Sequence, residues 1–340
     1  MLLSMCIVLS VQCQGVSQGT PEKLQETSVK KMISDALVRP PYLKKGDTIA
    51  LLSPAGILRS KKDVITKAIK VMESWGLHVV IGENMYNQNH HFAGTDAQRT
   101  QDFQEALDNP SIKAIWTARG GYGTVRILDG LDYTKFIKKP KWIIGYSDIT
   151  ALHNQIHNLG FETIHGMMAV NFGTKPALIS ETIATFKKAV FGEDLKYTLP
   201  ASTYNREGKA QGQLVGGNLT LLHCMLGSKT SLDTTDKILF IEEVGEYVYH
   251  VDRMLQSLKR AGYFKHVKGV IMGDISRIRK NPTPFGKTVE EVVLDNLKGL
   301  NIPVAFGMPA GHKDKNVALI LGRKVTMTVS KQGSKVVFED

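Results

Sequence analysis

Short apolar runs alternate with longer amphipathic stretches from about residue 41 to residue 172. The apolar runs have the length of buried strands, and the amphipathic stretches repeat apolar residues at three- and four-residue steps, as helices do. The pattern predicts strands at 48–53, 77–81, 113–118 and 142–144, and helices at about 65–75, from 95 toward 110, and at 149–159. This alternation favours an α/β fold with a parallel sheet covered on both faces, in which ligands bind beyond the carboxyl ends of the strands.

The pattern weakens at 173–208, where one amphipathic helix precedes a polar stretch with little periodicity. Apolar runs then return and indicate a second α/β region. They predict strands at 213–215, 237–244, 269–274, 303–308 and 317–329, a turn at 216–218, and helices ending near 226, at 249–262 and at 288–299. We therefore expect an N-terminal domain at 41–172, a linker at 173–208 and a C-terminal domain at 209–340.

Residues 1–40 are typical of a leader followed by a polar segment. Leu2 to Val11 is an apolar stretch of signal-peptide length, although no Lys or Arg precedes it. Lipid attachment at Cys13 would need a small residue before it, where this chain has Gln12. No stretch reaches the roughly eighteen apolar residues of a membrane span. The sequence thus predicts export to the periplasm or cell envelope, with a cytoplasmic location as the alternative.

The composition is that of ordinary globular protein, and 340 residues leave room for two domains. A formal net charge of +11 favours anionic partners. The basic residues are dispersed and form no stripe with interleaved aromatics, which argues against nucleic-acid binding and fits a small substrate that carries carboxylates. Cys224 lies in an apolar run, and we interpret it as a packed small hydrophobe rather than a nucleophile.

A serine stands at the corner between an expected strand and an expected helix. Residues 141–150 read K-W-I-I-G-Y-S-D-I-T, so the apolar run breaks at Gly145 and Ser147 comes just before the helix. A hydroxyl at such a corner is exposed, and the backbone N–H groups that follow point at what it attacks. Taken alone, the G-x-S pattern favours a simple helix N-cap at Ser147 over a nucleophile. A nucleophile therefore requires a base and an orienting acid elsewhere.

Among the histidines, His312 is the best candidate for the base. It lies in P-A-G-H-K-D-K-N after an expected strand, on a loop where it could reach a nucleophile. His153 and His157 have the i, i+4 spacing of a zinc pair, but Asn154 replaces the glutamate that the metalloprotease motif needs. His223 lies in an apolar helix, which is typical of a core histidine.

The orienting carboxylate is sought in I-L-F-I-E-E-V-G-E, where Glu242 and Glu243 fall at the end of an apolar strand. A carboxylate in that position is costly to desolvate unless it has a partner, and an imidazolium is a suitable one. The alternative is that both glutamates leave the sheet into solvent.

The backbone N–H of Asp148, directly after the serine, is the expected first donor of an oxyanion hole. The glycine-rich turn A-R-G-G-Y-G at 118–123 is the candidate for the second donor, at Gly121. The same turn also suggests dinucleotide binding, but it lacks the third glycine of that motif.

Four segments together resemble one family: A-R-G-G-Y-G at 118–123, I-I-G-Y-S-D at 143–148, L-F-I-E-E-V-G-E at 239–246 and G-x-P-A-G-H-x-x-x-N at 307–316. They are similar to the LD-carboxypeptidases, serine peptidases that include the microcin C immunity hydrolases. The resemblance runs from about residue 43 to 329. It implies a Ser-Glu-His catalytic triad at Ser147, Glu242 and His312.

The resemblance also implies a flavodoxin- or Rossmann-like N-terminal domain, a smaller C-terminal α/β domain, and no cofactor or metal. The implied reaction releases terminal D-Ala from murein tetrapeptide at its LD bond to meso-diaminopimelate. The best-known members act on recycled muropeptides in the cytoplasm, whereas an exported copy would meet murein in the envelope. The oligomeric state stays open, with a homodimer as one candidate.

Three alternatives to this function remain. A microcin-C-type immunity hydrolase would cleave acyl-adenylate analogues with the same triad. An α/β-hydrolase esterase would need G-x-S-x-G, and Ile149 replaces the last glycine. An exported two-lobed binding protein would share the layering but would bind its ligand without turnover.

Overall fold

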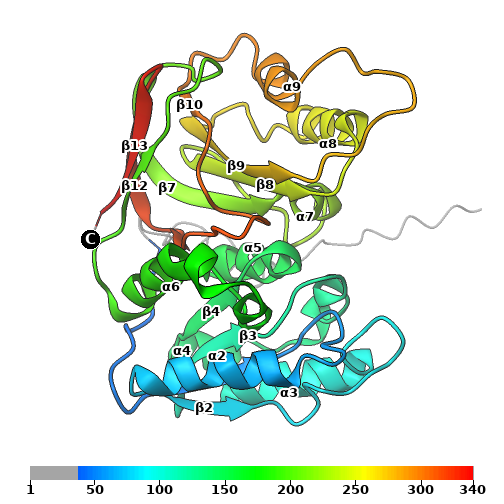
Figure 1. The fold of residues 1–340 in the computed structure, drawn as a ribbon, viewed down its shortest axis with the longest axis vertical. Helices are drawn as coiled ribbons and strands as arrows, with labels where there is room; N and C mark the ends of the chain where they lie inside the picture. The colour runs from blue at the N-terminus through cyan, green and yellow to red at the C-terminus, as the bar shows by residue number, and fades with distance from the viewer. Residues whose placement is uncertain (1–36, 340) are drawn as a thin grey trace, which may run out of the picture. The chain divides into compact units, whose positions relative to one another are not determined.

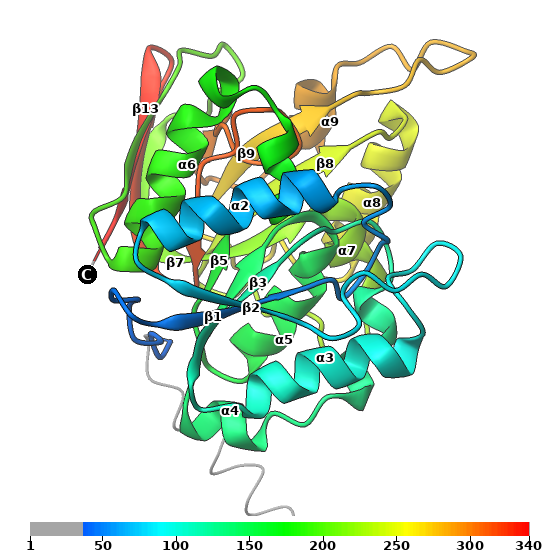
Figure 2. The ribbon, with the colours of Figure 1, turned by 60° about the horizontal axis from the view of Figure 1, so that its bottom comes forward.

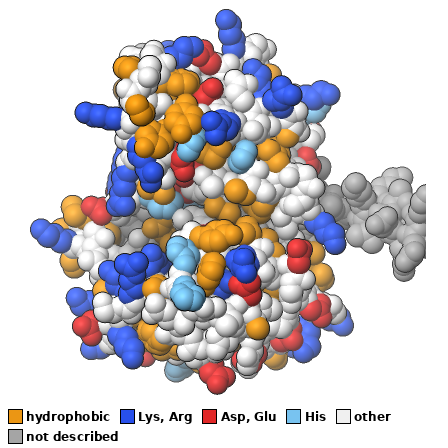
Figure 3. All heavy atoms as spheres, turned by 90° about the vertical axis from the view of Figure 1, so that its right-hand side faces the viewer, with side chains coloured by type: hydrophobic (Ala, Val, Ile, Leu, Met, Phe, Trp, Pro, Cys, Tyr) orange, Lys and Arg blue, Asp and Glu red, His pale blue; other side chains and the backbone are white. Residues whose placement is uncertain are grey.

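A computed structural model describes residues 37–339 of the chain. The predicted leader, including Leu2 to Val11 and Cys13, lies outside these described residues. Within 37–339, no helix is both long enough and apolar enough to cross a membrane. Basic side chains are scattered over the face shown in Figure 3 rather than gathered in one stripe, as their spacing along the sequence predicts.

The first sheet has the strand order β11-β5-β4-β3-β1-β2 (Figure 1). Its parallel strands are β1 (Thr48–Leu52), β2 (His78–Ile81), β3 (Ile112–Thr117), β4 (Trp142–Gly145) and β5 (Thr163–His165). Strand β11 (Leu319–Leu321) joins the edge of the sheet antiparallel to β5. The predicted parallel α/β arrangement is therefore confirmed, although β5 was not predicted.

Helices cover both faces of this sheet (Figure 2). They are α2 (Lys62–Ser74) and α6 (Pro176–Phe191) on one face, and α3 (Asp96–Asp108), α4 (Thr134–Lys138) and α5 (Thr150–Asn158) on the other. Alternate residues of β3 divide between the two layers: Trp116 packs with α2 and α6, and Ile115 with α3 and α5. Thr95 caps α3 in a capping box with Gln98, as the sequence predicts.

The second sheet has the order β10-β9-β8-β7-β12-β13-β6 and is mixed. Its strands are β6 (Lys196–Leu199), β7 (Gly208–Asn218), β8 (Ile238–Val244), β9 (Gly269–Ser276), β10 (Val304–Ala305), β12 (Lys324–Ser330) and β13 (Gly333–Phe338). Helices α7 (Leu219–Cys224), α8 (Val248–Arg260) and α9 (Val289–Asn296) pack on one face. Side chains on the other face, among them Phe240 and Ile271, belong to the same apolar cluster as Trp116. The two sheets therefore share a core.

Several elements differ from the sequence prediction. The strand expected at 317–329 is two strands in different sheets, because the chain turns at Gly322, where φ is +91°. The glycines expected in a turn at 216–218 lie inside β7. The stretch 173–208 contains α6 and also β6, an edge strand of the second sheet. Cys224 is exposed at the end of α7, so its prediction as a packed residue was wrong.

Candidate active site

Ser147 lies on a strained corner between β4 and the short 3-10 helix Ser147–Ile149 that leads into α5. Its φ is +63°, a left-handed conformation that non-glycine residues rarely adopt. Gly145 lets the strand and the helix approach closely, because a Cβ there would lie 2.3 Å from Thr117 Oγ1 and 2.8 Å from Ile149 Cγ1. Backbone strain of this kind clusters at functional sites, and the geometry is that of a nucleophile elbow rather than a plain N-cap.

Ser147, His312 and Glu242 form one hydrogen-bonded chain. The Nε2 atom of His312 lies 2.9 Å from Ser147 Oγ, and its Nδ1 atom lies 2.7 Å from Glu242 Oε2. Glu242 is completely buried and His312 is 16% exposed, whereas Ser147 is half-buried at the surface of the site. Ser147 follows β4 of the first sheet, Glu242 lies in β8 of the second, and His312 lies on the loop between β10 of the second sheet and β11 of the first. The fold thus brings together the three residues that the sequence analysis selected.

Glu242 and Glu243 both stay inside the protein at the carboxyl end of β8, so neither leaves the sheet into solvent. The pairing of β8 with β9 shifts register between Ile241 and Glu243, and such a bulge re-aims side chains. Glu242 therefore points to His312. Glu243 accepts hydrogen bonds from Asn218 Nδ2 and from the backbone N–H of Thr220.

His312 is held between the carboxylate of Glu242 and the hydroxyl of Ser147. Burial lowers the pKa of its imidazole, but the hydrogen bond and charge of Glu242, with the charge of Glu243, outweigh burial and raise the pKa above its ordinary value. The ring also packs edge-on against Tyr146, with 5.0 Å between the ring centres. Gly311, before the histidine, must be small, because a Cβ there would lie 3.0 Å from Glu242 Oε2.

The glycine-rich turn lies directly against the serine. A Cβ on Gly120 would lie 3.4 Å from Ser147 Oγ and 3.5 Å from the backbone nitrogen of Asp148. Gly121, the residue selected from the sequence, has φ +107° and packs on Gly56. The carboxylate of Asp148 accepts a hydrogen bond from the N–H of Thr124, 2.8 Å away, and so ties the corner to this turn. Sequence reasoning missed Gly120, although it stands in the same motif.

The other candidate histidines lie away from the serine hydroxyl. The Nε2 atom of His153 bonds the carbonyl of Gly145, and His157 bonds Thr163. Burial lowers the pKa of His153 to about 4 and that of His157 to about 3. His223 is only half-buried, which corrects its interpretation as a core residue. Within residues 37–339, no group of three or more His, Cys, Asp or Glu side chains could hold a metal ion.

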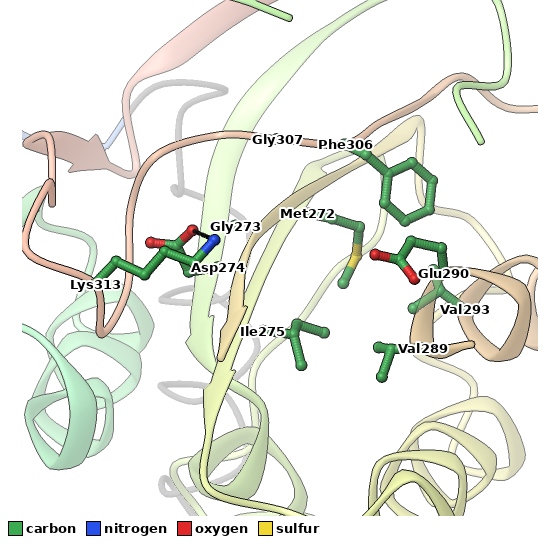
Figure 4. A pocket seen from close by; sticks show the side chains of 10 residues that line it. All are labelled: Met272, Gly273, Asp274, Ile275, Val289, Glu290, Val293, Phe306, Gly307 and Lys313. Carbon is green, nitrogen blue, oxygen red and sulfur yellow. Dashed lines mark ion pairs between the residues drawn. The ribbon is translucent and has the colours of Figure 1, made fainter. Parts of the chain in front are cut away.

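A cavity of about 140 Å³ borders the histidine loop (Figure 4). Apolar side chains from β9 and α9 form one part of its wall, among them Met272 and Val293. At the other end, Lys313 forms an ion pair with the buried carboxylate of Asp274, at 2.9 Å. Because Lys313 directly follows His312, this pair anchors the loop that carries the imidazole.

The chain is similar to known proteins over most of its length. The profiles of the LD-carboxypeptidase N-terminal and C-terminal domains match residues 49–166 and 211–327. A probable murein peptide carboxypeptidase of Bacillus subtilis is 35% identical over 86% of this chain and 92% of its own length. The microcin C7 self-immunity protein MccF of Escherichia coli is 28% identical over 84% of this chain and 91% of its own. The crystal structure of muramoyltetrapeptide carboxypeptidase from Oxalobacter formigenes superposes with a TM-score of 0.78 at 29% identity, over 86% of this chain and 99% of that one.

Proposed function

The chain belongs to the LD-carboxypeptidase family, and we propose that it is a serine peptidase that releases the C-terminal D-alanine of murein tetrapeptides. The observation that carries this proposal is the chain of hydrogen bonds from a left-handed Ser147 through His312 to a buried Glu242. A serine, a base and an orienting acid in this geometry are the parts that acyl transfer needs. Relatives named for murein peptides and muramoyltetrapeptide support the choice of substrate.

In the proposed mechanism, His312 accepts the proton of Ser147 as its Oγ attacks the carbonyl carbon of the scissile bond. Glu242 accepts the Nδ1–H of the same ring, which keeps Nε2 free to take that proton. The N–H groups of Asp148 and Gly121 donate to the oxyanion. His312 then gives the proton to the departing amine of D-alanine, and water hydrolyses the acyl-enzyme by the same route.

The test is hydrolysis of a defined murein tetrapeptide, with D-alanine and the tripeptide detected by mass spectrometry. We expect wild-type protein to form both products and Ser147→Ala to lose about three orders of magnitude or more in kcat. Ser180→Ala, on the exposed face of α6, is the matched control and should retain activity. Near-normal turnover by Ser147→Ala would refute the assignment of the nucleophile.

A second candidate function is hydrolysis of acyl-adenylate analogues, and the similarity to MccF favours it. One MccF structure is described as a complex with aspartyl sulfamoyl adenosine. The two functions share the triad and differ in the group attached to the scissile acyl group. Assaying the tetrapeptide and an aminoacyl sulfamoyl adenosine side by side separates them, since the preferred substrate shows the higher kcat/KM.

A two-lobed binding protein gives no reason for a serine, a histidine and a buried glutamate to be hydrogen-bonded in series. Export, the domain boundaries and a homodimer remain predictions. N-terminal sequencing of the protein from its native cells tests whether the leader is removed, and sedimentation of the purified protein tests the oligomeric state.

A further inference from the structure

Arg277 stands at the edge of the site with an unusual backbone. It follows β9, whose last residue, Ser276, pairs with Val244 of β8 and accepts a hydrogen bond from the N–H of Gly245. Arg277 has φ +53°, so its backbone is left-handed like that of Ser147. Strain of this kind at a non-glycine residue persists only where the surrounding structure imposes it, and it clusters at active sites and ligand-binding loops.

Arg277 is exposed and, within residues 37–339, no carboxylate pairs with its guanidinium, whereas other cationic side chains around the site have partners. Lys313 is paired with Asp274, Arg279 stacks over the ring of Tyr247, and Arg119 donates to the carbonyl of Ile57. Within residues 37–339, no carboxylate forms an ion pair with Arg277. It can therefore accept an anion from solution without first breaking a contact inside the protein.

The positive charge of Arg277 affects the pKa of His312, the proposed catalytic base. Burial lowers the pKa of His312, Glu242 and Glu243 raise it by more than burial lowers it, and the charge of Arg277 makes a smaller lowering contribution. The same charge lowers the pKa of Tyr146, which burial raises. Arg277 directly follows Ser276, which pairs with Val244, two residues beyond Glu242, so Arg277 lies at the same edge of the second sheet as the glutamate that holds His312.

The chemistry of a carboxypeptidase places an anion in the same region. The amine that leaves is bonded to a Cα that carries the terminal carboxylate, so the carboxylate carbon lies about 2.5 Å from the nitrogen that His312 protonates. That carboxylate needs a charged partner, because leaving it desolvated and unpaired is costly. An arginine suits this role, since its planar fork donates two parallel hydrogen bonds to a carboxylate.

We propose that Arg277 binds the C-terminal carboxylate of the peptide substrate and thereby restricts cleavage to the last residue. This inference rests on the proposed function, because it requires a peptide substrate with a free carboxyl end. If the inference is correct, the loop after β9 determines that the enzyme acts as an exopeptidase rather than as an endopeptidase. The oxyanion turn and the serine would serve either reaction equally.

The test compares two substrates, the murein tetrapeptide with a free terminal carboxylate and the same peptide with a C-terminal amide. We expect wild-type protein to prefer the free acid by about 30-fold or more in kcat/KM, and Arg277→Ala to reduce this ratio to within about threefold of one. Arg277→Lys keeps the charge but lacks the fork, and should give an intermediate ratio. Arg279→Ala, two residues further along, is the matched control and should retain the wild-type ratio.

The outcomes separate the two proposals. If wild-type protein cleaves neither peptide, the proposed function fails and this inference fails with it. If wild-type protein cleaves the acid and Arg277→Ala keeps the preference, the inference is overturned and the function stands. An equal loss of kcat/KM on both peptides by a folded Arg277→Ala variant would also overturn the inference. Such a result would mean that the arginine supports the structure of the site without recognising the carboxylate.

Discussion

The left-handed backbone of Ser147 predicts an unusual order of stability between two variants that lack its hydroxyl group. Ser147→Ala and Ser147→Gly both lose the hydroxyl and its contact with His312, so they differ only in the Cβ atom. At φ +63° an L-residue pays a steric cost that glycine does not. Glycine should therefore be the more stable replacement at this position, which is the reverse of the usual order.

The magnitude follows from two opposing effects. Left-handed backbone costs a residue with a Cβ about 1–2 kcal/mol. The greater freedom of glycine in the unfolded chain costs about 0.4–1 kcal/mol in the other direction. We expect Ser147→Gly to exceed Ser147→Ala by roughly 1 kcal/mol in free energy of unfolding. With an unfolding entropy of about 0.7 kcal/mol/K for a chain of this length, the midpoint of thermal unfolding should differ by about 1–2 °C.

The assay is urea unfolding followed by far-UV circular dichroism, with thermal scans as a second measure. Ser180, exposed in the interior of α6, provides the control pair. There, glycine should be less stable than alanine by about 1 kcal/mol, as in helices generally. If glycine were also the less stable residue at position 147, the elbow would not be strained and the argument from its backbone would be refuted.

Two further predictions concern protonation. Glu242→Gln removes the hydrogen bond and charge that raise the pKa of His312. We therefore expect kcat to fall by about two to four orders of magnitude and the acid limb of the kcat/KM profile to move to lower pH. A pH profile of tetrapeptide hydrolysis in which the acid limb does not move would contradict this prediction. Burial depresses the pKa of His153 to about 4 and of His157 to about 3, so between pH 6.5 and about pH 4 the unfolded state binds more protons and stability falls as the pH falls. In that window each histidine should lower the free energy of unfolding by about 1.4 kcal/mol for every unit by which the pH falls. The urea midpoint of His157→Asn should therefore fall less steeply with decreasing pH than that of the wild-type protein. An equal slope for the two proteins would refute the burial argument.

Local patterns in the sequence determined much of the fold. The spacing of apolar residues placed the strands β1 to β4 and the helices α2 and α3, because periodicities of two and 3.6 reflect which side chains face a core. Thr95 and Gln98 marked the start of α3 through chemistry confined to one turn. Shorter elements escaped prediction. Strand β5 has only three residues, and β6 is an edge strand whose alternation is brief.

The prediction of a single strand at 317–329 was wrong, and it shows why the pattern of apolar residues alone is insufficient. The pattern of apolar residues from 317 to 329 fits a single strand, but the folded chain turns at Gly322 and divides these residues between two sheets. A strand pattern records that one face is buried, but it does not say against which partner. That choice depends on which sheet edge the folded protein presents to the segment.

For the site, local signals in the sequence offered a serine corner, a pair of glutamates at a strand end and a loop histidine, and the resemblance to one family selected Ser147, Glu242 and His312 from them. Only the tertiary structure decided their contacts: 165 residues separate the serine from the histidine, and the core shared by two sheets brings their atoms to 2.9 Å. The left-handed backbone at Ser147, the bulge at Glu242 and the free charge of Arg277 likewise depend on packing. Neighbours in sequence determine the local element, but the geometry of a reaction depends on distances between elements, which packing alone sets.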